Sequence, residues 1–473
     1  MLNFFRRRKN RKVLIIGLDC AEPSLLFDRW RDDLPTFRQL MTQGGYGPLT
    51  SCIPCITVPA WSSMLSSKDP GVLGIYGFRN RADYAYDNLS IATGAAVKEK
   101  RVWDYLSEAG KESVVVGVPQ TYPVRPLNGH LVSGFLTPSL EKQFTHPNSL
   151  RYEIDLVLEG RPYEFDVKDF RTENKEHLLH QIYDMTEKRF KVMNHLIREK
   201  SWDFFGFVEI GVDRMHHGFW RFHDPQHRLY EPGNPFENAI KDYYRYLDQA
   251  IATLLEAIDD NTVVLVVSDH GAKRMDGGFC LNQWLYQEGY LVFHTPPPTD
   301  RVQRFDPGQV DWAQTTAWGE GGYYGRLWLN VAGREPQGKV PSADFERVRQ
   351  EISDKLESMV DHQGQPLKNM CYKPEEIYRE VRNISSDLII YFGDLHWRSI
   401  GSLGYPSVYT FENDTGPDDA NHAQDGLIIY YDPKQNLRGR RLEGLQLMDI
   451  APTVLSLLEQ PVPGEMQGRV IEV

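Results

Sequence analysis

The sequence predicts an α/β fold with a mostly parallel central sheet and helices on both of its faces. Short, continuous aliphatic runs recur along the chain, as is typical of strands that are covered on both sides. Longer segments with helical periodicity lie between these runs, and strands that alternate with helices favour a parallel sheet. No internal repeat or low-complexity tract interrupts this order.

Six apolar runs are expected to form strands and three periodic segments are expected to form helices. The first run, Val13–Leu18, ends in Asp19 and is too short for a signal-peptide core or a membrane span. The other expected strands are Ser113–Val118, Asp203–Val208, Thr262–Val267, Asp387–Phe392 and Gly426–Tyr431, and the expected helices are Glu176–Lys200, Phe236–Ile258 and Ser342–Met359.

Composition narrows the class of function. The 473 residues include 53 Lys and Arg against 65 Asp and Glu, a net charge of −12, which argues against binding of duplex nucleic acid. An acidic protein also repels anionic substrates, and bound divalent cations would solve that problem locally. Five cysteines do not make a disulfide framework, and an odd count fits a reducing compartment, so we expect a cytoplasmic protein. We expect no transmembrane segment. The basic run at residues 1–12 is expected to be a solvated end.

The whole chain, residues 1–473, is expected to form a single catalytic domain with two insertions. Residues 139–175 and 290–385 both break the rhythm of strands and helices, and both contain prolines. Long insertions between sheet elements are often lids or substrate-facing loops. Residues 139–175 are therefore a candidate lid and residues 290–385 a candidate cap subdomain. Surface decoration is the alternative for each.

Polar residues that directly follow the apolar runs are candidate metal ligands. Asp19 ends the first run, and Asp269 and His270 end another in VVLVVSDHGA. In open α/β sheets this carboxyl edge is where ligands bind. A charged pair buried there without a partner is costly, and a divalent cation is one suitable partner. For Asp19 taken alone, a helix cap is the alternative.

Two further segments contain candidate ligands. In VEIGVDRMHHGFW, Asp213 and His217 are four residues apart, so on a helix both would face one ion. His216, at a spacing of three, is the rival histidine, and a structural histidine pair is the alternative. His422 lies in GPDDANHAQDG, a composition that otherwise indicates a plain turn.

Thr57, in SCIPCITVPAWSSMLSS, is the candidate nucleophile. Pro59 and the helical-looking residues after it place Thr57 where a loop enters a helix, and a helix N-terminus suits a phosphate. Metal coordination can lower the pKa of a threonine hydroxyl without a neighbouring base. An ordinary N-cap or turn threonine is the alternative when this segment is considered alone.

Together these segments resemble the type I phosphodiesterase/nucleotide pyrophosphatase branch of the alkaline phosphatase superfamily. The matching stretches are IGLDCAEP, ITVPAWSSML, GVDRMHHGFW, VVSDHGA and GPDDANHAQDG, in the family's order. The segment LMDIAPTVLSLLEQPVPGEMQGR is also similar to the superfamily's C-terminal signature. The resemblance implies a three-layer alkaline-phosphatase-like sandwich that hydrolyses a small-molecule phosphate ester, above all a diester or a nucleotide pyrophosphate.

The resemblance also implies two divalent metal ions, with Zn²⁺ as the first choice and Mn²⁺ as the second. Thr57 would itself be a metal ligand, activated by one ion to form a phospho-threonine intermediate, while the other ion would stabilise the leaving oxygen. The implied ligands are Asp213, His217 and His422 for one ion and Asp19, Asp269 and His270 for the other.

Two positions depart from the family and leave phosphate recognition open. Ala60 stands where characterised nucleotide pyrophosphatases have an asparagine, and Val58 stands where bacterial alkaline phosphatases have an arginine. Another donor must then bind the phosphate oxygens. The candidates are the backbone around Thr57 and the side chains of Asn282, Lys273 and Arg326.

Several alternatives stay open beside a phosphodiesterase. A phosphomonoesterase would need an additional cation for its more highly charged substrate. A non-catalytic metal-binding protein on this fold is disfavoured because Thr57 and all six ligands are present. A sulfatase is suggested because Cys52 begins CIPCI, but Ile56 stands at the position of the sulfatase arginine. The aromatic candidates for contact with the leaving group, or for the core, are Trp220, Trp318 and Tyr323.

Overall fold

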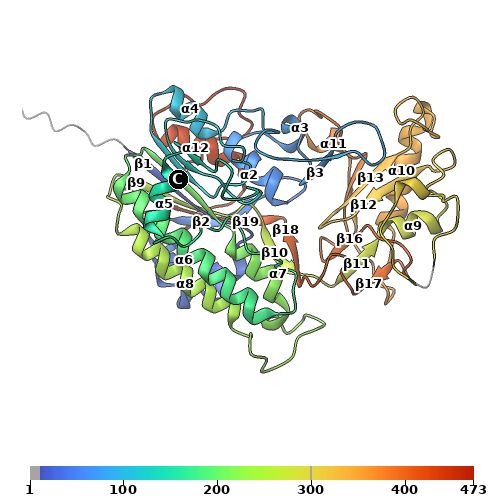
Figure 1. The fold of residues 1–473 in the computed structure, drawn as a ribbon, viewed down its shortest axis with the longest axis horizontal. Coiled ribbons are helices and arrows are strands. Elements are labelled where there is room, and N and C mark those ends of the chain that lie inside the picture. The colour runs from blue at the N-terminus through green and yellow to red at the C-terminus, as the bar shows by residue number, and fades with distance from the viewer. Residues whose placement is uncertain (1–10, 299–300) are drawn as a thin grey trace, which may run out of the picture.

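The computed structural model describes residues 11–298 and 301–473, so residues 1–10 of the basic run lie outside it. The chain forms a larger lobe around a central sheet and a smaller lobe around β12 and β13 (Figure 1). The strands β10 (Gly271–Arg274) and β18 (Ala420–Ala423) pair with each other between the two lobes. None of the described helices is long and apolar enough to cross a bilayer.

The central sheet has ten strands and is mostly parallel, as the sequence predicts. Its order is β20-β2-β19-β9-β1-β8-β5-β6-β7, with β21 paired to β2. The antiparallel pairs in this sheet involve β19 and β7. The strands are β1 (Lys12–Leu18), β2 (Gly45–Thr50), β5 (Ser113–Val116), β6 (Gly129–Val132), β7 (Thr145–His146), β8 (Phe204–Glu209), β9 (Thr262–Val267), β19 (Asp425–Tyr431), β20 (Arg440–Arg441) and β21 (Leu445–Gln446).

Helices cover both faces of this sheet because successive side chains of each buried strand point to opposite sides. Leu14 and Ile16 of β1 lie in one hydrophobic core, and Val13 and Ile15 lie in the other. The first core is covered by α1 (Pro35–Gln43), α5 (Leu150–Val157), α6 (Lys175–Glu199), α7 (Gly211–His223) and α8 (Ala239–Leu255). The second is covered by α2 (Thr57–Ser66), α4 (Val102–Glu108) and α12 (Ile450–Leu457).

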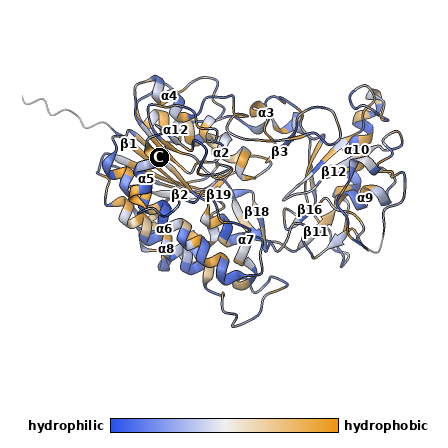
Figure 2. Ribbon diagram, viewed as in Figure 1, coloured by the Kyte–Doolittle hydropathy of each residue, from blue (hydrophilic) through white to orange (hydrophobic). Residues whose placement is uncertain are grey.

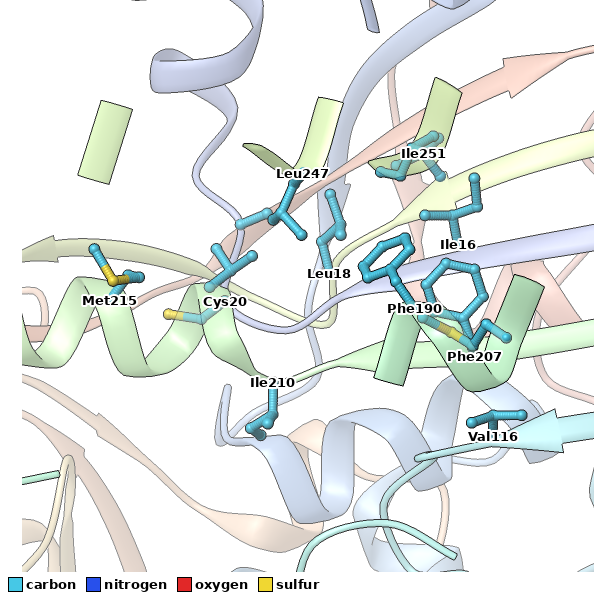
Figure 3. Close-up of a cluster of buried hydrophobic side chains, with 14 of the residues drawn as sticks. Ile16, Leu18, Cys20, Val116, Phe190, Phe207, Ile210, Met215, Leu247 and Ile251 are labelled. Atoms are coloured by element: carbon cyan, nitrogen blue, oxygen red, sulfur yellow. The ribbon is translucent and has the colours of Figure 1, made fainter. Parts of the chain in front are cut away.

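Figure 3 shows part of the first core, where Ile16 and Phe207 of the sheet lie near Phe190 of α6 and Ile251 of α8. These side chains are almost fully buried. In Figure 2, hydrophobic residues concentrate in α12 and along the central strands, whereas α6 and α8 carry residues of both kinds. The amphipathic helices therefore present an apolar stripe to the sheet and a polar face to solvent.

The smaller lobe has a core of its own. A four-stranded antiparallel sheet, β12-β13-β15-β14, and a three-stranded sheet, β16-β11-β17, enclose buried aromatic residues such as Trp318 and Trp328. The elements are β11 (Gly277–Cys280), α9 (Leu281–Gln287), β12 (Ala317–Glu320), β13 (Gly325–Leu329), α10 (Phe345–Glu357), β14 (Met370–Tyr372), β15 (Leu388–Tyr391), β16 (Trp397–Ile400) and β17 (Tyr409–Thr410).

One expected strand belongs to a different sheet. The run Asp387–Phe392 was assigned to the parallel sheet, but it forms β15 of the smaller lobe. Both faces of β15 are covered there, since Leu388 and Ile390 lie in one cluster and Ile389 and Tyr391 in another. A buried apolar run indicates that a strand is covered on both sides, but it does not indicate to which sheet the strand belongs.

The remaining elements are short. The hairpin β3–β4 (Arg79–Arg81 and Leu89–Ile91) and the single turns α3 (Pro70–Leu73) and α11 (Pro374–Ile377) lie along the side where the lobes meet. Single 3₁₀ or π turns occur at Leu25–Arg29, Arg31–Asp33, Pro307–Gln309, Ser342–Asp344 and Leu447–Asp449.

A buried carboxylate holds the start of α1 and gives a test of this packing. Asp248 of α8 accepts hydrogen bonds from the backbone N–H groups of Thr36 (3.1 Å) and Phe37 (2.9 Å), in place of a local cap. Asp248→Ala would leave both donors without this acceptor, and the N–H of Phe37 is buried, so we expect a loss of about 2 kcal/mol in unfolding free energy. Asp242→Ala, at an exposed position of the same helix, should change it by less than about 0.5 kcal/mol. Equal urea midpoints for the two variants would contradict this role.

Candidate metal centre

The candidate ligands converge at one edge of the central sheet. Asp19 follows β1, Asp269 and His270 follow β9, and α7, which carries Asp213, begins just after β8. Strands β8, β1 and β9 are parallel neighbours, so their carboxyl ends meet at this edge. Two further candidate residues, Thr57 and His422, lie on segments outside these three strands.

His422, in a segment whose composition otherwise indicates a plain turn, lies in the short strand β18. Its register partner is Ala272 of β10, two residues after His270. This antiparallel pairing is what brings His422 beside His270, and their rings stack with centroids 3.9 Å apart. Asp, Asn and Gly are typical of turns, so the local composition indicates one here. The strand forms because it pairs with β10, a distant segment that local composition does not reveal.

The first triad consists of Asp19, Asp269 and His270, all with no solvent exposure. Trp61 Nε1 donates to Asp19 Oδ2 at 2.7 Å, and the Cys20 backbone N–H donates to Asp269 Oδ1 at 3.2 Å. No hydrogen-bond partner is found among the described residues for the other oxygens, Asp19 Oδ1 and Asp269 Oδ2. These lie 4.0 and 3.2 Å from His270 Nε2, so the unpartnered atoms face one another.

The second triad consists of Asp213, His217 and His422. Helix α7 places Asp213 and His217 four residues apart, as the sequence predicts, with Asp213 Oδ1 at 3.3 Å from His217 Nε2. His422 Nε2 lies 4.0 Å from Asp213 Oδ1 and 3.3 Å from His217 Nε2. Arg214 Nη1 donates to the other oxygen, Asp213 Oδ2, at 2.5 Å.

The three histidines share one orientation. In each, Nδ1 lies next to an oxygen acceptor: Gly271 O for His270 (3.1 Å), Cys55 O for His422 (2.8 Å), and Asp418 Oδ1 (2.7 Å) for His217. A proton on each Nδ1 leaves each Nε2 with a lone pair. Metal-ligating histidines commonly have such a partner on the second nitrogen.

The donor set therefore fits divalent cations. Imidazole nitrogens and carboxylate oxygens are ligands that Zn²⁺ and Mn²⁺ both accept. In both triads carboxylate oxygens lie 3.2 to 4.0 Å from imidazole nitrogens. With the carboxylates ionised and each Nε2 unprotonated, this arrangement is costly in a buried site unless a cation offsets it. Asp213, His270 and His422 also form a group within reach of one ion, so the two triads adjoin.

Electrostatics in the metal-free protein point the same way. Burial, followed by the nearby carboxylates, raises the pKa of Asp19 well above its usual value, and burial does the same to the pKa of Asp269. Burial lowers the pKa of His270 to about 4. Burial also acts to lower the pKa of His217, but Asp418 and Asp213 outweigh it and raise that pKa to about 9. A divalent cation among these groups would oppose the raised pKa values, because it favours ionised carboxylates and neutral imidazoles.

Thr57 is the first residue of α2 and is 4% exposed. Its Oγ1 lies 3.5 Å from His270 Nε2. It lines a pocket of about 230 Å³ together with Asp213, His217 and His422. The helix leaves the first N–H groups, of Thr57 and Val58, without intrahelical acceptors, and Pro59 has none to offer. The candidate nucleophile thus faces both triads from a helix N-terminus.

His216 points away from this pocket. Its Nδ1 lies 3.0 Å from Cys20 O and its Nε2 lies 3.3 Å from Tyr244 Oη. Burial lowers the pKa of His216 to about 3, so the ring stays neutral. Of the two histidines that the sequence left open, His217 is the one whose free nitrogen meets Asp213 and His422.

The three side chains suggested as phosphate donors do not line the Thr57 pocket. Asn282 is fully buried, and its amide group bonds both N–H and C=O of Gly319. Lys273 Nζ donates to the backbone and carboxylate of Asp394. Arg326 forms an ion pair with Glu320 and also bonds Arg79 O. Each has partners of its own outside the pocket.

Two arginines and an aspartate that sequence reasoning missed do belong to the site. Arg171 and Arg214 line the Thr57 pocket. Asp418 accepts from His217 and from Arg171 Nε at 3.0 Å. Asp418 lies in the segment GPDDANHAQDG, four residues before His422, so the match of this segment to the family could have identified it as a site residue. Arg171 lies in the insertion 139–175, where local sequence carried none.

The three candidate aromatic residues lie in different places. Tyr323 lines the pocket and stacks on His217 and His422, with ring centroids 4.9 and 4.4 Å apart. Trp318 is part of the smaller lobe's core, and Trp220 packs against His216 with a centroid distance of 5.3 Å.

The chain is similar to known proteins in sequence pattern and in fold. The family model for type I phosphodiesterase / nucleotide pyrophosphatase matches residues 13–418. Phosphonoacetate hydrolase from Sinorhizobium meliloti 1021, in complex with phosphonoformate, aligns at 16% identity and a TM-score of 0.60, covering 95% of this chain and 96% of that one. Human ectonucleotide pyrophosphatase / phosphodiesterase 5 aligns at 13% identity and a TM-score of 0.54, covering 96% of each chain.

The murine form of the second protein, inactive and in complex with AMP, aligns at 13% identity and a TM-score of 0.55 over 96% of each chain. At these identities the likeness confirms the alkaline-phosphatase-like α/β fold. No curated protein matches the chain by sequence.

The two neighbouring histidines provide a test of the site's geometry. In protein loaded with Zn²⁺, His217→Ala is expected to lose about one bound ion per chain, because its Nε2 faces Asp213 and His422. His216→Ala should keep the wild-type metal content and lose only stability. Elemental analysis after gel filtration measures both, and metal loss in the second variant alone would contradict the assignment.

Proposed function

We propose that the chain, which belongs to the type I phosphodiesterase / nucleotide pyrophosphatase family, hydrolyses phosphodiesters or nucleotide pyrophosphates through attack by Thr57. The supporting observation is the position of Thr57, at a helix N-terminus 3.5 Å from His270 Nε2 and in one pocket with Asp213, His217 and His422. Family membership supports phosphoester hydrolysis, and this geometry supports the choice of nucleophile.

Two divalent cations complete the proposal. Bound at the two triads, they would lower the pKa of the Thr57 hydroxyl and offset the negative charge of the phosphate. The ligand chemistry accepts Zn²⁺ and Mn²⁺ alike. The proposed ligands are Asp19, Asp269 and His270 for one ion and Asp213, His217 and His422 for the other.

The chain's own groups would act in a fixed order. Thr57 Oγ1 gives up its proton to water and forms a bond to phosphorus. The bond from phosphorus to the leaving oxygen breaks, and its electron pair goes to that oxygen, which takes up a proton from water. The product is a phospho-threonine, which water then hydrolyses to free Thr57 and phosphate monoester. The backbone N–H groups of Thr57 and Val58 are available to hold a phosphate oxygen, in place of the residues replaced by Ala60 and Val58.

Three phenylalanines restrict water at this site. Phe78, Phe135 and Phe170 line the pocket with Thr57, and apolar walls strengthen every charge interaction inside. Phe170 comes from residues 139–175, together with Arg171. These two contacts support the proposal that this insertion acts as a lid. The core of the smaller lobe supports the proposal that residues 290–385 belong to a cap subdomain.

A phosphomonoesterase is the second candidate. A monoester has more charge than a diester, and Arg171 and Arg214 provide additional cations in the pocket wall. Arg214 is paired with two carboxylates, those of Asp166 and Asp213, whereas Arg171 is paired, within the ranges that the structure describes, with Asp418 alone. Arg171 therefore has more charge to offer a substrate. Comparing bis-p-nitrophenyl phosphate with p-nitrophenyl phosphate distinguishes the two activities.

Replacing the nucleophile tests the proposal. In Zn²⁺-loaded protein, Thr57→Ala should lower kcat for bis-p-nitrophenyl phosphate by at least about 10³-fold, because no phospho-enzyme can form. Metal content and melting temperature should stay near those of wild type. Thr57→Ser should retain part of the activity, since it keeps a hydroxyl.

Thr42→Ala, at an exposed threonine of α1, is the matched control and should turn over like wild type. If the Thr57→Ala variant hydrolysed the diester at a rate near wild type, Thr57 would not be the nucleophile.

A further inference from the structure

A second cavity adjoins the Thr57 pocket. Its volume is about 340 Å³, and Phe78, Arg171 and Tyr323 line both spaces. The cavity lies toward the smaller lobe, since its other walls include residues 320–324, Arg326, and Arg398 of β16. A substrate whose phosphorus lies at Thr57 would therefore reach this second cavity past Arg171.

The second cavity is rich in positive charge. Four arginines line it against two carboxylates, in a chain whose net charge is −12. One carboxylate, Glu320, is paired with Arg326, and the other, Asp414, accepts from Ser402 Oγ at 2.9 Å. The arginines of the cavity are Arg79, Arg171, Arg326 and Arg398.

Arg398 has unused donors although it is buried. It is 4% exposed, and no hydrogen-bond partner is found for its Nε and Nη1 among the described residues. The nearest carboxylate oxygen, Asp418 Oδ2, is 3.7 Å away and already accepts from Arg171 and the Tyr323 hydroxyl. A buried guanidinium without hydrogen bonds is costly, so this arrangement calls for an anionic acceptor.

Charge decides on which side of Arg398 that acceptor would lie. Arg398 also borders another cavity, of about 310 Å³, behind Asp418. Carboxylates outnumber arginines there, so that space would repel an anion. Its charged walls are Glu173, Glu412, Asp418 and Asp419 against Arg221, Arg228 and Arg398. Only the space toward Arg171, Arg79 and Arg326 has an excess of positive charge.

We propose that the second cavity binds a second anionic group of the substrate, a carboxylate or a phosphate, through Arg398 with Arg171 and Arg79. The proposal rests on the proposed function, which puts the reacting phosphate at Thr57. It narrows the substrate class to phosphoric compounds that carry another anionic group one cavity away from the reacting phosphorus. Simple diesters with uncharged substituents leave the Arg398 donors unpaired and bind weakly.

Matched phosphonates test the proposal without requiring turnover. Propylphosphonate has no second charge, 2-carboxyethylphosphonate replaces its methyl group with a carboxylate, and ethane-1,2-diphosphonate provides a second phosphonate. Titration calorimetry with Zn²⁺-loaded wild type should show at least about tenfold tighter binding of one or both charged ligands. The stronger of the two identifies the second group as carboxylate or phosphate.

Three variants locate the effect. In Arg398→Gln the advantage of the charged ligand over propylphosphonate should fall below about threefold, because hydrogen bonds to the charged guanidinium are lost. Arg79→Gln, at an exposed position, should reduce it without disturbing the core, and it provides the test if Arg398→Gln does not fold. Arg347→Gln, exposed on α10, should keep the full advantage.

Equal affinities for all three ligands in wild type would overturn the proposal. So would an advantage that persists in both Arg398→Gln and Arg79→Gln, since it would then arise from metal chelation. The proposed function is tested separately by hydrolysis of bis-p-nitrophenyl phosphate. Wild type that discriminates between the phosphonates but never hydrolyses an ester would retain the anion subsite and lose the proposed function.

Discussion

The structure depends on a set of buried carboxylate oxygens and imidazole nitrogens that face one another at one edge of the central sheet. Asp19 and Asp269 each have one oxygen with a hydrogen-bond donor and one with no partner in the described part of the chain. The histidines direct Nε2 into the same space, because their Nδ1 atoms meet oxygen acceptors. Burying such groups together is unfavourable unless positive charge lies among them. Two cations between these groups would be consistent with the ligand types, with the Nδ1 contacts of the histidines and with the position of Thr57.

The fold provides this arrangement through a few specific contacts. Gly17 of β1 allows Trp61 to approach, since a Cβ at that position would lie 2.6 Å from the indole ring. That approach lets Trp61 Nε1 reach Asp19 Oδ2 and leaves Oδ1 turned toward His270. The same helix, α2, presents Thr57 at its N-terminus. One helix thus positions both a ligand and the candidate nucleophile.

Much of this site was predictable because its signals are local. Apolar runs followed by Asp19 and by Asp269–His270 mark strand ends, and the spacing of Asp213 and His217 matches one face of a helix. The strands β1, β5, β8 and β9 lie close to their expected bounds for the same reason.

The rest depends on contacts between distant segments. His422 is positioned by the pairing of β18 with β10, and Asp387–Phe392 joins the smaller lobe because of side chains that cover it from elsewhere. Arg171 and Arg398 come from segments with no recognisable motif. Their roles follow only when the walls of two adjoining cavities are known.

The most direct test of the account is anomalous X-ray diffraction at the zinc edge from crystals grown with Zn²⁺. We predict two peaks beside Thr57, one among Asp19, Asp269 and His270 and one among Asp213, His217 and His422, within about 2.0–2.2 Å of the ligand atoms. Crystals with these side chains ordered but no anomalous peak among them, at saturating Zn²⁺ and again at the manganese edge with Mn²⁺, would contradict it.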